Sequence, residues 1–450
     1  MNQSTPKRSW TESLQKAAAE AFPGLVGLWI AVALLKLGNP IILDNRIATP
    51  SSWVEAIYQP WPVLWGYLLF AAAFLTGLSV WKWRGNSPRL LVFTPVLWLA
   101  WQCVSSLQHV DAPDAKLIAA TVPHFAVCVL AFYLGLFALS RMESSRAFWI
   151  GVAGAWFVVV CIGWRQHFGG LQEMRDYFHS LPNWRDQPPE LIAKLASNRI
   201  YSTLVYPNAL AGAIILFSPA IIAGLAYVSP GKRWLTRAIP PALGLAGALG
   251  CLVWSGSKGG WVIALGLAIL ALLLRARASS VRMFILCLLV IGGISGFWFR
   301  YQAYFERGAT SISARFDYWK VALANIRERP VLGSGPGTFM NVYRRMKSPE
   351  AEMTRLVHND YLEQATDSGI IGALLFGTLI AGSLVFGYRS VEGGGVHLGV
   401  WLGVVGVAIQ CFSEFGLYIP ALAWPWFLGM GALVGRVPGL KTVDKGSGSS

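Results

Sequence analysis

The residues best suited to chemistry lie between Ser311 and Gly377. His358 and Asn359 stand directly before Asp360 and Glu363, and a carboxylate three residues after a capping residue is typical of a helix start. We therefore expect Asp360 to cap a helix and His358 to lie just before it. Imidazole exchanges protons near neutral pH, so His358 is a candidate acid or base. An isolated histidine at a loop end also fits a structural role.

A second element in this stretch carries Arg315. The segment SISARFDYWKVALANIRERP predicts an amphipathic helix that Pro330 ends, with Arg315 in its first turn. The following VLGSGPGTF is rich in glycine but lacks the GK[ST] of a nucleotide-binding loop, so it predicts a tight turn. The expected apolar side of the helix comprises Phe316, Trp319, Leu323 and Ile326.

Composition indicates the setting of these elements. Of 450 residues, 55% are hydrophobic and 13% are charged, whereas soluble domains carry about 25% charged residues. A helix that crosses a bilayer needs about 20 mostly apolar residues, and the chain supplies such runs repeatedly. We expect an all-α polytopic membrane protein. This excludes an ordinary cytosolic enzyme, a disordered chain and a disulfide-stapled secreted module.

Twelve membrane-spanning helices are predicted within a single transmembrane domain, residues 1–436. The tenth span should begin near Gly369, where Gly369, Ala373 and Gly377 form a small-residue stripe that would let helices approach closely. Residues 437–450 form a cytoplasmic tail whose end, GSGSS, resembles an appended linker. The expected spans are 21–38, 61–81, 90–106, 117–140, 147–164, 204–228, 238–255, 260–274, 283–299, 369–388, 396–417 and 419–435.

The distribution of lysine and arginine predicts the orientation. With both termini in the cytoplasm, the inside segments hold 18 of these residues, and the three short outside loops hold only Arg46, Lys116 and Lys258. Cytoplasmic loops of membrane proteins collect positive charge, so we expect an N-in, C-in chain. This accounts for much of the net charge of +15 without a nucleic-acid partner.

Two outside segments are long, about 165–203 and 300–368, and both are basic. Long segments cross membranes largely regardless of charge, so their basic residues need another reason. A polyanionic ligand would supply one, and pairing with local acids or lipid headgroups would supply another. Mid-membrane ionisable residues are nearly absent, which argues against an ion-coupled transporter. The six cysteines lie in apolar runs and show no metal-binding spacing.

These motifs together resemble the O-antigen ligase and polymerase superfamily of bacterial envelope glycosyltransferases. The ligase signature is His, then Asn, Ser or Gln, nine residues, Gly, two residues and Gly. His358-Asn359, the nine residues 360–368, Gly369 and Gly372 match it in full. Other similar features are Arg315 with Trp319, the turn from Pro330 to Gly335, Arg199 with Tyr206-Pro207-Asn208-Ala209-Leu210-Ala211, and Ser255-Gly256-Ser257-Lys258-Gly259-Gly260, in which Lys258 replaces the usual Arg.

The resemblance implies a fold similar to GT-C glycosyltransferases and a periplasmic active site on a multi-pass protein of the bacterial inner membrane. Its members move a glycan from undecaprenyl pyrophosphate to a sugar hydroxyl, here lipid A-core or another glycan. Arg199, Arg315 and Lys258 would bind the leaving diphosphate, since guanidinium groups suit phosphate. His358 and Arg315 would be catalytic, with His358 as base and inversion at the anomeric carbon.

Further residues are weaker candidates. Asn208, Trp319, Asn359, Tyr361 and Glu363 form a second rank, together with Asp367, and a helix cap or helix face would explain several of them equally well. Two acidic pairs in outside loops, Asp44 with Glu55 and Asp111 with Asp114, would be compatible with a metal-dependent enzyme, but solvated loop acids explain them too. We expect no metal and no cofactor.

Four functions remain open. Ligation of O-antigen to lipid A-core leads, because the chain has one ligase-type histidine motif and a long last loop. A polysaccharide polymerase of the same superfamily is the runner-up, and an O-linked protein glycosyltransferase is a third member type. A transporter or flippase for a lipid-linked anion belongs to another class. It would need basic residues through the middle of the membrane, whereas a transferase would concentrate them at the outer mouth.

Overall fold

The structure is a computed structural model, and it describes residues 10–83, 88–108, 114–142, 145–187, 192, 195–228, 234–275, 280–306 and 310–436. Within these residues every regular element is a helix. The predicted tail 437–450 and Asp111 lie outside the described residues. So do several basic residues, namely Lys7, Arg8, Arg84, Lys194, Lys232, Arg233, Arg277, Lys441 and Lys445.

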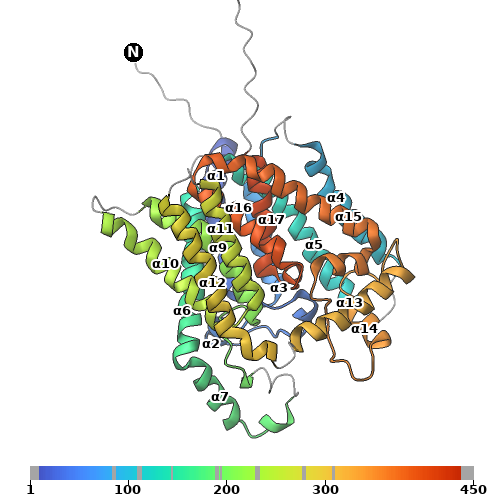
Figure 1. Cartoon of the computed structure of the whole chain (residues 1–450). Coiled ribbons are helices and arrows are strands. Elements are labelled where there is room, and N and C mark those ends of the chain that lie inside the picture. Colours follow the sequence, from blue (N-terminus) through green and yellow to red (C-terminus); the bar gives the residue numbers. More distant parts are fainter. Residues whose placement is uncertain are drawn as a thin grey trace, which may run out of the picture.

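Each of the twelve predicted spans coincides with a helix (Figure 1). Over the described ranges, however, only nine helical stretches are long and apolar enough to cross a membrane, so the number twelve is not confirmed. Helices α4, α16 and α17 are not among the nine. The helices are α1 Trp10–Lys36, α3 Val63–Gly77, α4 Arg89–Ser106, α5 Asp114–Phe137, α6 Arg146–Arg165, α9 Pro207–Val228, α10 Trp234–Trp254, α11 Lys258–Arg275, α12 Ser280–Glu306, α15 Asp360–Tyr388, α16 Gly395–Gln410 and α17 Pro420–Gly435.

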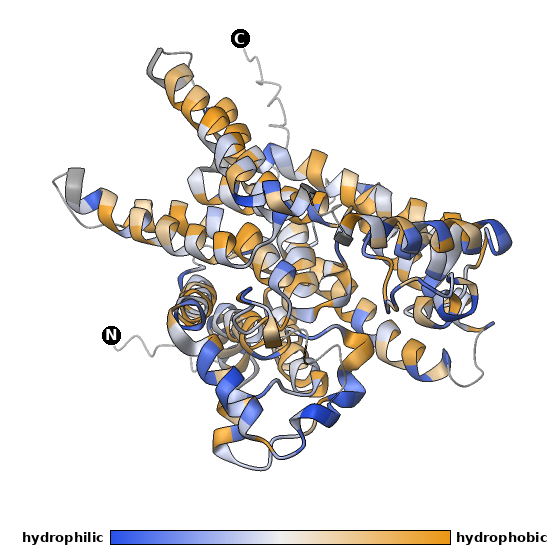
Figure 2. Cartoon of the chain, turned by 60° about the horizontal axis from the view of Figure 1, so that its bottom comes forward, coloured by the Kyte–Doolittle hydropathy of each residue, from blue (hydrophilic) through white to orange (hydrophobic). Residues whose placement is uncertain are grey.

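Shorter elements occupy the connections. The first of the two long segments that are predicted to lie outside contains a π-helical turn η4 (Gln166–Gly170), α7 (Leu171–Ser180) and η5 (Trp184–Asp186). The second contains α13 (Thr310–Glu328) and α14 (Phe339–Met346). Figure 2 colours the long helices largely hydrophobic and shows hydrophilic stretches toward the lower end of Figure 1. The remaining elements are η1 Ile41–Arg46, α2 Trp53–Tyr58, η2 Leu78–Val80, η3 Leu139–Arg141, η6 Arg389–Gly393 and η7 Gly416–Tyr418.

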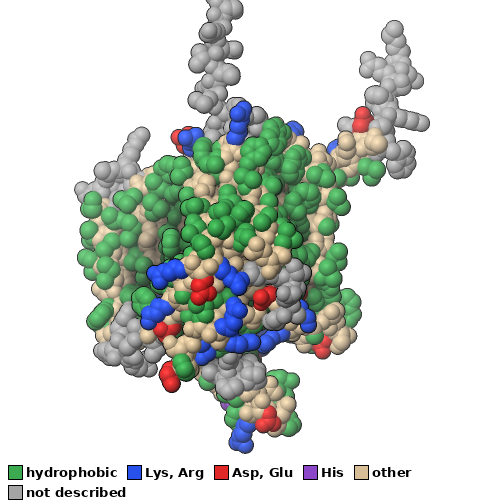
Figure 3. Space-filling view, turned by 90° about the vertical axis from the view of Figure 1, so that its right-hand side faces the viewer, with side chains coloured by type: hydrophobic (Ala, Val, Ile, Leu, Met, Phe, Trp, Pro, Cys, Tyr) green, Lys and Arg blue, Asp and Glu red, His purple; other side chains and the backbone are tan. Residues whose placement is uncertain are grey.

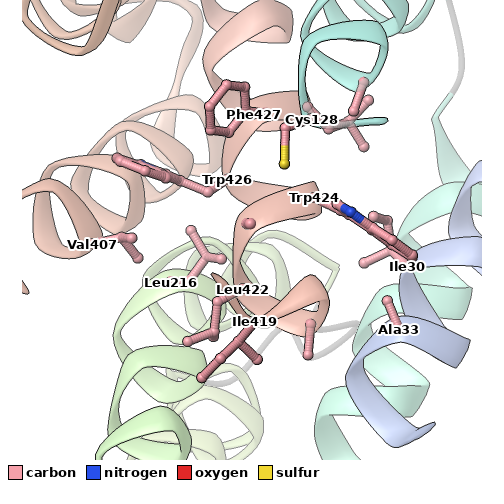
Figure 4. Close-up of a cluster of buried hydrophobic side chains, with 14 of the residues drawn as sticks. Ile30, Ala33, Cys128, Leu216, Val407, Ile419, Leu422, Trp424, Trp426 and Phe427 are labelled. Carbon is pink, nitrogen blue, oxygen red and sulfur yellow. The ribbon is translucent and has the colours of Figure 1, made fainter. Parts of the chain in front are cut away.

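Helix α17 occupies the centre of the bundle. Its Trp424, Trp426 and Phe427 are fully buried among side chains of α1, α5, α9 and α16 (Figure 4). Helix α5 approaches α17 so closely at Gly431 that a Cβ on this residue would collide with the carbonyl oxygen of Phe132. Small residues therefore do mediate close helix packing in this chain, as expected in membranes, but here between α5 and α17.

The small-residue stripe predicted at Gly369, Ala373 and Gly377 does not bring two helices close together. Gly377 has open space where a Cβ would lie, and Gly369 stands at a break in α15 with φ of 70°. The prediction of a packing stripe there is wrong, because four-residue spacing identifies one side of a straight helix and α15 is not straight at Gly369.

Helix α13 confirms the predicted amphipathic helix, which ends before Pro330. Two details differ. The helix begins at Thr310, so Arg315 lies in its second turn. Its buried side is formed by Tyr318, Val321 and Ala322, whereas Phe316 and Leu323 on the predicted apolar side are 53% and 45% exposed. The helix contacts α14 and α15.

Candidate functional site

A small cavity lies where α9 begins and α16 ends, beside α13 and the segment before α15. Its volume is about 120 Å³, and several of the polar residues around it are predicted site residues or their neighbours in the chain. The polar side chains that line it are Arg199, Tyr206, Asn208, His358, Gln410 and Glu414. Separate parts of the chain thus meet at one place.

Glu414 joins these parts. One carboxylate oxygen accepts hydrogen bonds from Arg315 at 2.5 Å and from the side-chain amide of Asn208 at 2.7 Å. The other carboxylate oxygen lies 3.8 Å from Nδ1 of His358. The side chain of Glu414 is only 12% exposed, so this carboxylate is the negative centre of a largely enclosed cationic site.

Arg199 is held from two sides. Its Nε donates to the carbonyl oxygen of Ser255 at 2.7 Å, and one terminal guanidinium nitrogen donates to Asn208 at 2.7 Å. Gly256, with φ of 62°, leaves room for the guanidinium, because a Cβ would lie 3.2 Å from Nε. Burial lowers the pKa of Arg199 and nearby Glu414 opposes this effect. An arginine titrates so far above neutrality that the group stays cationic.

His358 adopts an uncommon backbone conformation, with φ of 57°. Its ring lies 4.8 Å from the ring of Phe415 and 5.7 Å from that of Tyr318. The side chain is 27% exposed, and Nδ1 has no hydrogen-bond partner among the described residues. Burial raises the pKa of Tyr318 to about 12, so the phenol beside His358 stays neutral. The imidazole is oriented by packing, and its buried Nδ1 faces the carboxylate of Glu414.

The helix cap next to His358 differs from the prediction by one residue. Asn359, and not Asp360, caps α15, since its side-chain oxygen accepts from the backbone N–H groups of Tyr361 and Leu362. Tyr361 donates to the carbonyl oxygen of Ala408 and so ties α15 to α16. Trp319 is packed beside the buried side of α13. The side chains of Asn359, Tyr361 and Trp319 do not line the cavity.

Three acids of α15 are fully buried and fix three loops. Asp360 accepts from the backbone N–H of Leu417, and Glu363 accepts from that of Val357 at 2.5 Å. Asp367 accepts from the backbone N–H of Gly337 at 3.0 Å and from the hydroxyl of Tyr418. Asp360 and Glu363 therefore do not act as the predicted capping pair. They hold in place the segments that carry His358 and Glu414.

The glycine-rich segment forms the predicted turn and packs on the break in α15. The backbone N–H groups of Ser334 and Gly335 donate to the carbonyl oxygens of Thr366 and Asp367 at 2.8 and 2.9 Å. Gly333 and Gly369 have φ of 64° and 70°, and side chains there would collide with backbone atoms of the opposite segment. The two glycines let the turn and the break interlock.

Lys258 lies beside the cavity without lining it. Its ammonium group stands 3.8 Å from the ring centroid of Tyr304 and 5.3 Å from that of Tyr301. It begins α11, directly after the turn that holds Arg199. Its role as a phosphate ligand remains a prediction.

The acids considered for metal binding serve other contacts. Asp44 accepts from the backbone N–H of Val63, Glu55 bonds to Ser51, and Asp114 accepts from Asn341. In the part of the chain that the structure describes, no three His, Cys, Asp or Glu residues are grouped as a metal site would require.

Glu414 is the site residue that no sequence motif identifies. In the sequence it stands out only as an acid near the outer end of an apolar run. That position is itself a signal, because an ionisable residue beside a membrane span is a candidate functional residue by default. Its partners are far from it in the sequence, so no local pattern includes it.

Comparison with known proteins supports the resemblance noted from the motifs. Residues 243–377 match the family model described as O-antigen ligase. This range includes Lys258, Arg315, His358 and the first three glycines of α15, and it ends before Glu414. The match confirms the resemblance to the O-antigen ligase and polymerase superfamily and indicates a glycosyltransferase-like enzyme of the ligase or polymerase type.

One relative is an uncharacterized protein of Haemophilus influenzae, which is 28% identical over 141 residues. The aligned region covers 26% of this chain and 35% of that protein, so the similarity spans about a third of the relative's length.

Proposed function

We propose that the protein is an inverting glycosyltransferase of the bacterial inner membrane, with a fold similar to GT-C enzymes. It transfers a glycan from undecaprenyl pyrophosphate to a sugar hydroxyl of lipid A-core at the periplasmic face. The observation that carries the proposal is the convergence of Arg199, His358 and Glu414 at one cavity, with Arg315 bonded to Glu414 beside it. Two guanidinium groups, one imidazole and one carboxylate meet the needs of this reaction.

The two arginines suit the donor's leaving group. A diphosphate departs with concentrated negative charge, and preorganised cations that stabilise developing charge often contribute most to catalysis. Arg199 is anchored by Ser255 and Asn208, and Arg315 by Glu414. Both guanidinium groups are thus oriented before substrate binds. Each has five N–H donors, which leaves several for phosphate oxygens.

His358 and Glu414 suit the acceptor. His358 removes the proton of the acceptor hydroxyl while that oxygen attacks the anomeric carbon and the bond to the diphosphate breaks. The carboxylate 3.8 Å away stabilises the imidazolium that forms. A direct displacement inverts the anomeric carbon. The activated linkage supplies the driving force, so the proposal includes no cofactor and no metal.

The centre of the bundle supports a transferase over a flippase. Leu422 lies at the cavity, and Leu216, Val407 and Trp426 pack in the same buried cluster (Figure 4). A flippase for a lipid-linked anion needs a polar route across the membrane. The described core shows apolar side chains there, whereas the cationic groups of the candidate site lie at one end of it.

The test is transfer by the purified protein. It would receive undecaprenyl-pyrophosphate-linked glycan with and without lipid A-core, in the presence of EDTA. We expect a lipid A-core-linked product from the unmodified protein. We expect no such product from the Arg315→Ala and His358→Ala proteins, whose folding would be checked by size-exclusion chromatography. Longer lipid-linked chains without a core product would identify a polymerase instead. Activity that requires added divalent metal would overturn metal independence.

A further inference from the structure

Helix α13 has an exposed side that no described part of the protein covers. Its buried side, formed by Tyr318, Val321, Ala322 and Asn325, packs against α14 and α15. Ile312, Phe316 and Leu323 are 39%, 53% and 45% exposed. Their spacing of four and then seven residues places them on one narrow side of the helix.

Basic side chains lie beside this apolar side of the helix, and acidic side chains lie farther round. At about 100° per residue, Lys320 and Arg327 lie next to Phe316 and Leu323. Asp317 and Glu328 lie farther round on the same exposed surface. The exposed surface thus changes from apolar to basic to acidic. A helix in the plane of a membrane interface has this order, because lysine and arginine extend to the lipid phosphates while acids stay in water.

The apolar side continues onto the transmembrane part of the protein. Val331, three residues after the end of α13, is 52% exposed, and Ile370 and Leu374 of α15 are 48% and 64% exposed. The backbone N–H of Ile370 donates to the carbonyl oxygen of Pro330 at 2.8 Å, which joins the two surfaces. Lipid that contacts this side of α15 would therefore also meet the end of α13.

The views agree with this continuity. Helix α13 runs across the lower end of the bundle in Figure 1. Figure 3 faces the side that carries α13, α14 and α15, with an apolar surface above and Lys and Arg side chains gathered below it. The exposed basic residues of the two short helices are Lys320, Arg327, Arg344 and Arg345.

We propose that α13 lies in the outer interface of the lipid bilayer, with Ile312, Phe316 and Leu323 among the acyl chains and Lys320 and Arg327 at the lipid phosphates. Arg315 lies on the other edge of the same apolar side. The helix therefore holds this guanidinium at the depth of the phosphate layer. If the proposed function holds, this is also the depth at which the diphosphate of the lipid-linked donor arrives.

Depth measured by nitroxide labels tests the helix position. Single cysteines would replace Phe316, Leu323, Asp317 or Glu328 in the full chain, with the exposed native Cys103, Cys161 and Cys287 changed to alanine. The proteins would be reconstituted in vesicles of phosphatidylethanolamine and phosphatidylglycerol. We expect labels at 316 and 323 to collide mainly with dissolved oxygen, and labels at 317 and 328 mainly with a water-soluble nickel complex. Equal nickel accessibility at all four positions would overturn the proposal.

A pair of neighbouring substitutions tests the consequence for transfer. Leu323→Glu places a charge among the acyl chains, whereas Ala324→Glu places the same charge on the polar side between Lys320 and Asp317. We expect the transfer rate to fall about tenfold or more for Leu323→Glu and to change little for Ala324→Glu. The free energy of burying a leucine side chain corresponds to about a tenfold change in an equilibrium constant. Equal effects would contradict the proposal. The nitroxide labels report the depth of α13 even in a protein without transfer activity. Failure of the proposed function can therefore be told apart from failure of the proposed helix position.

Discussion

Glu414 contacts both Arg315 and Asn208 and lies close to His358, so its charge balances the cavity. We predict that Glu414→Gln lowers kcat about tenfold or more, since a hydrogen bond between charged groups is worth about 1.5–3 kcal/mol. It should not raise the KM for the donor, because glutamine keeps a side-chain oxygen that accepts from Arg315 and holds this proposed phosphate ligand in place. Steady-state kinetics of the purified variant would measure both constants.

Two control variants sharpen this test. Glu414→Asp keeps the charge and should retain more activity than Glu414→Gln. Arg315→Ala should raise the donor KM as well as lower kcat, since it removes a proposed phosphate ligand. A Glu414→Gln protein with a higher donor KM and unchanged kcat would mean that Glu414 shapes the binding site and plays no part in the chemical step.

His358 combines a proposed role as general base with an uncommon backbone conformation. Its φ of 57° suits asparagine and glycine better than most residues. We predict that His358→Asn keeps or slightly raises the melting temperature while transfer falls about 10²–10⁴-fold, the usual contribution of a general base. Thermal unfolding and the transfer assay would be run on the same preparation. Retained transfer would show that His358 serves only as a turn residue.

The sequence predicts much of this site for an identifiable reason. His358, Asn359, Gly369 and Gly372 occur at a fixed spacing in one segment, so a motif can identify them. Glu414 contacts the site from a separate helix end, so its partners are set by tertiary packing alone. The prediction of Asp360 as the helix cap is wrong, because Asn359 caps α15 and the carboxylate of Asp360 accepts from Leu417, a contact that no local pattern shows.

At the scale of elements, the interlock between the glycine-rich turn and α15 positions His358. We predict that Gly333→Ala and Gly369→Ala each destabilise the protein by about 3 kcal/mol or more, because each combines positive φ with a backbone collision. Gly377→Ala is the matched control in the same helix. It has open space and should be neutral or stabilising by up to about 1 kcal/mol.

Thermal unfolding in detergent, followed by size-exclusion chromatography, would measure these effects. Similar melting temperatures for all three variants would mean that the turn and α15 separate without cost. Unfolding of Gly377→Ala as severe as that of Gly369→Ala would mean that a partner covers the outer surface of α15.

The helices themselves are predictable because apolar runs mark them directly. Which side of each helix is buried is not, as α13 shows. In a soluble protein, Phe316 and Leu323 would indicate the core side. Beside a bilayer an apolar residue can contact lipid as readily as protein, so the pattern alone does not separate the two. The buried side of α13 is formed instead by residues that face α14 and α15.

Across the whole molecule, described basic residues of the predicted inside loops gather at the end opposite the site. Lys16, Lys82, Arg141 and Arg146 line one common surface hollow, and Arg141 donates to the carbonyl oxygen of Gly435. The candidate site draws on Arg199, Arg315 and His358 at the other end. This separation agrees with an N-in, C-in chain whose site faces the periplasm.

Labelling of introduced cysteines tests this orientation directly. We predict that Ser348→Cys, in the second long outside segment, reacts with a membrane-impermeant maleimide in intact spheroplasts. Glu392→Cys, between α15 and α16, should react only after lysis. Both positions are exposed, so access to the reagent depends on the side of the membrane. The exposed native cysteines would be changed to alanine to remove background labelling. The reverse pattern would place Arg315 and His358 on the cytoplasmic side, where a periplasmic acceptor does not reach them.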